Sequence, residues 1–107
     1  MTHEDRIQKA IVEFIRTAYP SYITFTIPNG GGRSKAQGAI LKATGVLAGI
    51  PDLCVLMPGK AIFIEVKTTK GRLSAVQKSL KPRIEALGFP VHICRSIDDA
   101  AEVMRAA

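Results

Sequence analysis

Two acidic side chains and a lysine lie where apolar, strand-like segments begin and end. Asp52 follows Gly49-Ile50-Pro51 and opens one such segment, and Glu65 and Lys67 close the next. The dipeptide Pro58-Gly59 between them predicts a tight turn, so we expect the two segments to pair as a hairpin. Carboxylates on adjacent strands could bind a hard cation such as Mg²⁺, which takes carboxylate oxygens and waters and leaves room for a phosphate.

Side-chain alternation along a strand makes these charges informative. Glu65 and Lys67 share one face of their strand, whereas the other face carries Ile62, Ile64 and Val66. Residues 61–64 are apolar on both faces, as expected of a central strand, so charges at its end depart from the pattern. Taken alone, an E-x-K sequence is typical of a solvated strand end. Asp52 taken alone is typical of a residue that follows a turn. Their combination favours a metal site.

Length and composition indicate one basic domain, residues 1–107. At about 100–200 residues per domain, 107 residues leave room for only one. The 15 lysines and arginines against 9 acidic residues give a net charge of +6, which favours a polyanionic partner. No apolar stretch approaches the roughly 20 residues that span a bilayer, so we expect no membrane segment.

The two cysteines are expected to be structural. Cys54 and Cys94 each lie in an apolar, β-branched segment, which predicts two buried thiols. His3 and His92 are the only histidines, and they do not supply the closely spaced ligand pairs of a zinc site. Because nothing indicates a disulfide framework, we expect a cytoplasmic protein.

Hydrophobic periodicity predicts an α/β fold, a small mixed sheet flanked by helices. Apolar residues at helical spacing predict helices over residues 3–18, 35–44, 74–87 and 96–105. Apolar and β-branched runs predict strands over residues 22–27, 52–57, 61–67 and 91–95. The helix between the last two strands forms a βαβ crossover, which should place those strands parallel.

These motifs together resemble a known nuclease family. Gly-Ile-Pro-Asp followed by Glu-Val-Lys resembles the PD-(D/E)XK nuclease superfamily. Within that superfamily the chain is similar to the VRR-Nuc (virus-type replication-repair nuclease) family over nearly its whole length. The matching residues are Asn29-Gly30, Gly45-Val46, Gly49-Ile50-Pro51-Asp52-Leu53, Ile64-Glu65-Val66-Lys67, Lys70-Gly71-Arg72-Leu73-Ser74 and Gln77. The restriction-endonuclease-like αβββαβ core of the family agrees with the predicted element order, and the chain looks like a phage-type stand-alone member.

The resemblance implies a metal-dependent DNA endonuclease that cleaves branched or flapped DNA, as Holliday-junction resolvases do, with Mg²⁺ or Mn²⁺. Asp52 and Glu65 would hold the metal, with the backbone carbonyl of Val66 as a further ligand. Lys67 would position or help deprotonate the attacking water and offset charge on the phosphorane. A bound divalent ion lowers the pKa of that water and stabilises the leaving oxygen.

Two assignments implied by the resemblance have alternative interpretations. The family uses a glutamate on its first helix; at about 100° per residue, Glu4 faces the sheet and Glu13 faces solvent, so we expect Glu4 to be the metal ligand. Its alternative role is to stabilise the helix dipole. Gln77 matches the glutamine after the catalytic lysine, but Ser74 three residues earlier also predicts a capping box, and both roles are compatible.

Basic side chains in the loops beside the predicted site are candidates for binding the DNA backbone. They are Arg33, Lys35, Lys70 and Arg72. Asn29 is a further candidate, although it would also suit the glycine-rich turn that follows it. Each phosphate contact adds salt-dependent affinity, and any one of these residues alone is equally compatible with a solvated surface.

Size and motif content also bear on assembly and on rival functions. One subunit of 107 residues is small against a DNA junction, so we expect a symmetric homodimer with two sites. The main alternative is a non-catalytic nucleic-acid-binding module with a nuclease-like fold, which the clustered carboxylates disfavour. An enzyme acting on small phosphorylated substrates would be expected to carry G-x-x-x-x-G-K-[ST] or G-x-G-x-x-G, and the chain has neither.

Overall fold

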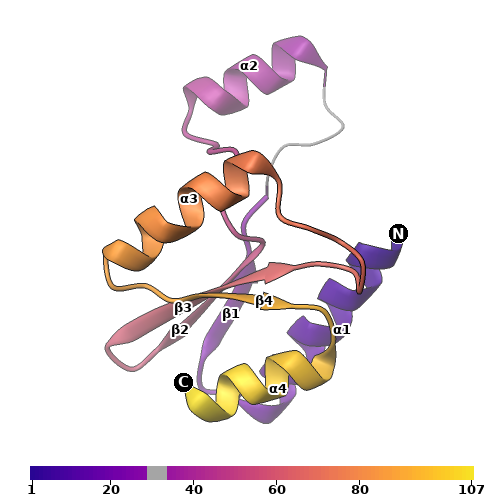
Figure 1. Ribbon diagram of the computed structural model, residues 1–107, viewed down its shortest axis with the longest axis vertical. Helices are drawn as coiled ribbons and strands as arrows, with labels where there is room; N and C mark the ends of the chain where they lie inside the picture. The colour runs from indigo at the N-terminus through magenta and orange to yellow at the C-terminus, as the bar shows by residue number, and fades with distance from the viewer. Residues whose placement is uncertain (29–33) are drawn as a thin grey trace.

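A four-stranded mixed sheet organises the residues that the computed structural model describes, 1–28 and 34–107. Its strands, in their order across the sheet, are β1 (Ile23–Thr26), β2 (Leu53–Met57), β3 (Lys60–Val66) and β4 (Val91–Cys94). The β1–β2 and β2–β3 pairs are antiparallel, and β3 and β4 are parallel. This confirms the predicted α/β fold, the hairpin at Pro58-Gly59 and the parallel crossover (Figure 1).

Two helices cover one face of the sheet. They are α1 (His3–Ala18) and α4 (Ile97–Ala106), which pack on each other and on the inward side chains of the strands. The core of this layer contains Ile11, Ile15, Leu53, Val55, Met57, Ile62, Ile64, Val66, Cys94, Ala100 and Met104. The central position of β3 explains why its apolar residues are buried there.

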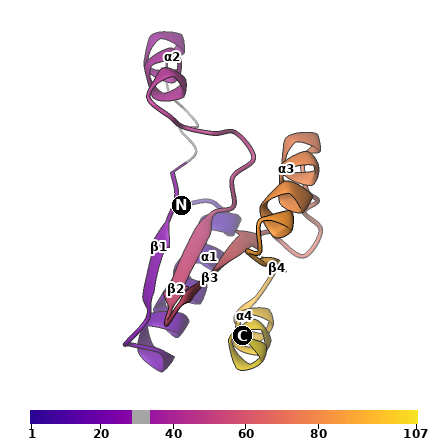
Figure 2. The same ribbon diagram turned by 90° about the vertical axis from the view of Figure 1, so that its left-hand side faces the viewer.

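A third helix, α3 (Ala75–Ala86), lies on the opposite face, over β3 and β4 (Figure 2). Its buried residues Leu80 and Ile84 pack with Val91 and Phe63. Phe63 and Glu65 alternate with the core residues Ile62, Ile64 and Val66, so Glu65 projects toward this second face, as the sequence predicts.

Hydrogen-bonding side chains fix where the helices begin. Thr2 with Asp5 and Ser74 with Gln77 form capping boxes at α1 and α3. At α4, Ser96 accepts from the Asp99 backbone as predicted, but the Asp99 carboxylate accepts from Arg95 N–H instead of the cap residue. The helices and strands match their predicted spans to within a residue or two at their ends.

The second helix, α2 (Lys35–Ala43), projects away from the sheet and the other helices (Figure 1). It has no buried residue, and in the described part of the chain it packs against no other helix or strand. Ile40 is exposed on it. A helix of 9 residues gains little stability alone, so capping by Ser34 and Gln37 matters more here than elsewhere.

Cys54 and Cys94 are both buried and free, as predicted. None of the described helices is long and apolar enough to cross a membrane.

Candidate active site

The register of the β2–β3 hairpin brings the two predicted carboxylates together. Leu53 pairs with Ile64, so Asp52, one residue earlier, and Glu65, one residue later, meet at the same end of the hairpin. Asp52 Oδ2 accepts a hydrogen bond from the Val66 N–H at 2.8 Å. This contact fixes one carboxylate oxygen of Asp52 against β3.

The backbone of Asp52 is held from the opposite side by β1. Its carbonyl accepts from the Ile27 N–H at 2.8 Å and from the Thr26 hydroxyl at 3.1 Å. Thr26 Oγ1 in turn accepts from Gln8 Nε2 of α1 at 3.1 Å. Asp52 is therefore positioned by two strands and, through Thr26, by the first helix.

The Gly-Ile-Pro segment before Asp52 has a packing role at each residue. Gly49 has a φ of +85°, and a Cβ there would lie 2.7 Å from a methyl carbon of Val76, so only glycine fits against the first turn of α3. Ile50 packs against the α3 cluster of Leu80 and Ile84, and Pro51 is fully buried. Local packing therefore aims Asp52 at the end of β3.

Glu65 is an almost fully buried carboxyl group, with 3% of its surface exposed. Its pKa is raised from 4.5 to about 9, mainly by burial and then by hydrogen bonding to Asp52 and the charge of Asp52. The Lys67 charge opposes this shift, and Glu4 adds to it weakly. Two neighbouring carboxyls, one buried and protonated at neutral pH, form a donor set that a divalent cation would neutralise, so the residues fit a hard metal ion.

Glu4 is half-buried in the first turn of α1, and its charge reaches Glu65. Glu13, the alternative on that helix, is exposed and pairs with Lys9 at 3.1 Å, as expected of the solvent side. Within residues 1–28 and 34–107, however, no three His, Cys, Asp or Glu side chains converge closely enough to hold one ion. The close pair is Asp52 and Glu65, and metal binding by Glu4 stays a prediction.

Gln77 forms the predicted capping box and also contacts Glu65. Its Oε1 accepts from the Ser74 N–H at 2.8 Å, and its backbone N–H donates to Ser74 Oγ at 3.2 Å, which completes the capping box. Its Nε2 donates to Glu65 Oε1 at 3.1 Å. One amide group thus starts α3 and holds the buried carboxyl group.

Lys67 follows β3 directly and is half-buried. Its backbone N–H donates to the Cys94 carbonyl at 3.1 Å, which continues the parallel ladder. Its positive charge lowers the pKa of Glu65, against the effect of burial. Asp52, Glu65 and Gln77 therefore meet at the end of the sheet where Lys67 leaves β3, and the catalytic roles of these residues stay predictions.

The predicted DNA-binding residues fall into two groups. Lys35, Lys70 and Arg72 are exposed, and the latter two lie on the loop between β3 and α3. Asn29 and Arg33 lie outside the described residues. Arg95, which contacts this loop, was not predicted, because an arginine after a strand has no distinguishing sequence signal.

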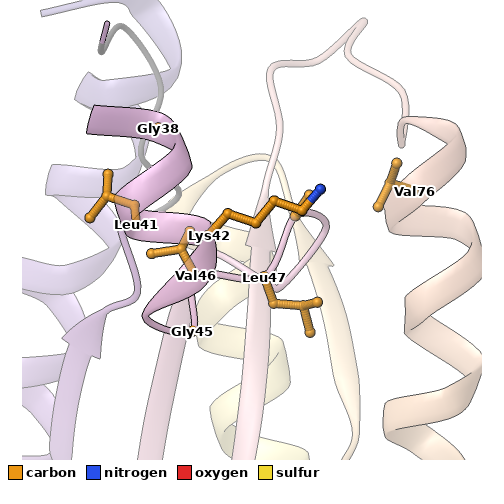
Figure 3. Close-up of a pocket in the computed structure, with 8 residues that line it drawn as sticks. Gly38, Leu41, Lys42, Gly45, Val46, Leu47 and Val76 are labelled. Atoms are coloured by element: carbon orange, nitrogen blue, oxygen red, sulfur yellow. The ribbon is translucent and has the colours of Figure 1, made fainter. Parts of the chain in front are cut away.

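A hollow of about 650 Å³ lies apart from the carboxylates, between α2, the segment after it and the start of α3 (Figure 3). The described residues that line it are mainly apolar and include Leu41, Val46, Leu47 and Val76, and Lys42 is the only charged one among them. Figure 3 shows Val76 facing this space from α3. Because no carboxylate lines the hollow, it is not the predicted metal site.

Comparison with known proteins identifies the family. The sequence model of the VRR-NUC domain matches residues 3–98. The chain belongs to the VRR-NUC family. A comparison with curated protein sequences found no match.

Two solved structures share the fold of this VRR-NUC domain. One, described as a VRR-NUC domain, superposes with a TM-score of 0.69 at 23% identity, covering 98% of this chain and 97% of that one. The other, a VRR-NUC domain protein, gives a TM-score of 0.74 at 19% identity, covering 97% and 86%. At these identities the likeness shows the restriction-endonuclease-like fold alone, and the family match places the chain among nuclease domains.

Glu65 should make the stability of the metal-free VRR-NUC domain depend on pH. Its pKa rises from 4.5 in the unfolded chain to about 9 in the folded protein, so the folded protein binds this proton more tightly. The resulting contribution to the free energy of unfolding is complete below pH 4.5 and is lost as the pH rises toward about 9. In EDTA, we expect the melting temperature to fall between about pH 5 and pH 9. Each kcal/mol lost from the free energy of unfolding lowers the melting temperature by about 4–8 °C.

A neutral side chain at this position should remove most of that dependence. Glu65→Gln keeps an oxygen that accepts from Gln77 and should melt above the parent protein at alkaline pH. Glu13→Gln, at an exposed position, should keep the parent's pH slope. Equal slopes in the parent and Glu65→Gln, measured by circular dichroism, would contradict the role assigned to Glu65.

Proposed function

We propose that this VRR-NUC domain is a metal-dependent DNA endonuclease that hydrolyses phosphodiester bonds with Mg²⁺ or Mn²⁺. The observation that carries this proposal is the pairing of Asp52 with the buried Glu65 beside Lys67. A fold that only bound DNA would gain nothing from acidic groups facing a polyanion. The family match supports nuclease chemistry independently of this geometry.

The residues at the end of β3 have complementary roles in the proposed reaction. Asp52 and Glu65 would hold the cation, with the carbonyl of Val66 as a further ligand and Glu4 as the predicted ligand from α1. When bound, the ion lowers the pKa of a water and stabilises the leaving oxygen. Lys67 would position the attacking water or help to deprotonate it, and its charge would offset that of the phosphorane. Gln77 keeps the Glu65 carboxylate oriented through its amide hydrogen bond.

The proposed substrate is branched DNA bound through its backbone. The net charge of +6 and the exposed Lys70 and Arg72 beside the site favour phosphate contacts. Lys35 on α2, together with Asn29 and Arg33, would extend this contact surface. With 4 Phe, 2 Tyr and no Trp, the chain has few side chains for stacking on bases, which favours recognition of shape.

The removal of one charge at Asp52 should separate catalysis from binding. Asp52→Asn keeps an oxygen that accepts from the Val66 N–H, so the fold should be preserved. Mutation of a residue that only hydrogen-bonds a metal ligand typically lowers metal affinity or activity by about 10–100-fold. Loss of the ligand Asp52 itself should therefore slow cleavage by at least about 100-fold. DNA affinity should stay close to that of the parent, and Asp98→Asn, an exposed position on α4, should cut normally.

The measurement is a cleavage assay on labelled four-way junctions, flaps, forks and linear duplexes with Mg²⁺, Mn²⁺ or EDTA. Cleavage of branched DNA that needs the metal and Asp52 supports the proposal. Cleavage that persists in EDTA would overturn the mechanism. Tight binding of DNA with no cleavage by the parent would instead favour a non-catalytic module.

Variants of Ser74 and Gln77 should distinguish the cap from the site. Ser74→Ala removes the hydroxyl that caps α3 and should lower stability by about 1 kcal/mol with near-parental cleavage. Gln77→Glu preserves a capping box but removes the amide donor to Glu65. A hydrogen bond to a charged group contributes about 1.5–3 kcal/mol, so cleavage should fall at least about tenfold with little change in stability. Urea unfolding and single-turnover rates measure the two effects, and parallel changes in both variants would refute the distinction.

The homodimer is part of the same proposal, because paired cuts in branched DNA require two sites. Ile23, Phe25 and Leu56 are exposed on the face of β1 and β2 that α3 leaves uncovered. A stable interface buries about 800 Å² on each partner, which is a modest share of the 6912 Å² surface. We infer that a second copy covers this apolar face.

Light scattering after gel filtration at micromolar concentration should give twice the 11.5 kDa mass of one chain. Leu56→Lys should shift the protein to a monomer, because it places a charge in the proposed interface. Leu87→Lys, on a side chain that is 77% exposed at the end of α3, serves as the control and should remain dimeric. A parent protein that is monomeric with and without DNA would exclude the dimer.

A further inference from the structure

Arg95 binds the backbone of the loop that follows β3. Its Nη1 donates to the carbonyls of Thr68 and Gly71, each at 2.6 Å, and approaches that of Thr69 at 3.4 Å. Nη1 carries two hydrogens, and the two short hydrogen bonds use both of them. A single guanidinium group therefore joins the two ends of a four-residue turn.

The turn that Arg95 binds is packed on the base of Lys67. The Gly71 N–H donates to the Thr68 carbonyl at 3.0 Å and closes the turn. A Cβ on Gly71 would lie 3.0 Å from Thr68 Oγ1 and 3.5 Å from Lys67 Cβ. The conformation of this turn consequently determines the space around Lys67 on one side and the direction of Lys70 on the other.

Arg95 is itself held by a rigid part of the fold. Its backbone N–H donates to Asp99 Oδ2 at 2.8 Å, and Asp99 N–H donates to Ser96 Oγ at 3.2 Å. The preceding residue, Cys94, is fully buried in the core. The guanidinium group is in none of the ion pairs found among the described residues, so its charge faces only carbonyl oxygens there.

We propose that Arg95 is a positioning residue for DNA cleavage. By fixing residues 68–71 in one conformation, it directs Lys67 to the paired carboxylates and Lys70 and Arg72 to the same stretch of DNA backbone. Lysine is a poor replacement, because its ammonium nitrogen lies one bond closer to the backbone than Nη1 and is more strongly hydrated. The inference rests on the proposed nuclease function but adds a residue whose effect on the loop can be measured without DNA.

The direct test is limited digestion with trypsin, because Lys70 and Arg72 are both trypsin sites within or beside the turn. In the parent protein these bonds should resist cleavage, since the turn is hydrogen-bonded at both ends. Arg95→Ala should be cut after these two residues at least about tenfold faster, since a locally opened segment is cleaved in proportion to its open population. Arg105→Ala is the matched control, because Arg105 is exposed on α4 and pairs only with Glu102 of its own helix.

The second readout is cleavage of labelled branched DNA under single-turnover conditions with metal. A misplacement of about 1 Å can cost 10²-fold in rate, so Arg95→Ala should cut about 100-fold more slowly at saturating DNA, with a smaller change in affinity. Added guanidinium ion should restore part of the rate to Arg95→Ala but not to Asp52→Asn. Arg95→Lys should remain slow, because it keeps the positive charge but not the reach of Nη1, which separates the position of the donor from its charge.

Each outcome decides the inference. Trypsin resistance of Arg95→Ala equal to that of the parent would overturn it, as would an opened turn with parental cleavage rates. If the parent cuts no DNA, the proposed function fails, and the effect of Arg95 on the loop is still judged from the trypsin pattern. If circular dichroism shows that Arg95→Ala is unfolded, Arg95→Gln, whose shorter polar side chain fills part of the space but does not reach both carbonyls, replaces it in both assays.

Discussion

Bringing Asp52 and Glu65 together costs electrostatic free energy, because the carboxylates of the half-buried Asp52 and the buried Glu65 repel one another and neither is fully hydrated. The protein offsets part of this cost by keeping Glu65 protonated at neutral pH, as its pKa of about 9 indicates. The hairpin register, the Val66 N–H and the Gln77 amide all hold the pair in place despite the repulsion. A cation between the two groups would replace the proton on Glu65, and both carboxylates would then be attracted to the cation.

The rest of the fold places several element ends around that pair. The first turn of α1 contributes Glu4, the first turn of α3 contributes Gln77, and the segment after β4 contributes Arg95. Helix N-termini carry a partial positive charge, so both helices also favour anions on this side of the sheet. The cores on both faces of the sheet supply the rigid support, since β3 is buried between α1 and α4 on one side and α3 on the other.

The sequence was sufficient to predict the carboxylate pair because a glutamate inside an apolar strand is unusual and a Pro-Gly turn fixes which residues face each other. It also predicted which side of α1 faces the sheet, because rotation about a helix follows from spacing. It could not give the distance from Glu4 to the pair, which depends on how α1 sits on the sheet. The contacts of Arg95 were equally inaccessible, because they join backbone carbonyls that lie 24–27 positions away in the chain.

The separation of α2 from the core has a consequence for how such domains diversify. None of its residues contributes to the interior, so substitutions, insertions or deletions there carry little penalty for folding. Changes in the paired carboxylates or in their packing, by contrast, affect a buried and charged site. Substitutions can therefore accumulate in this outlying helix without disturbing the packing that holds the carboxylate pair.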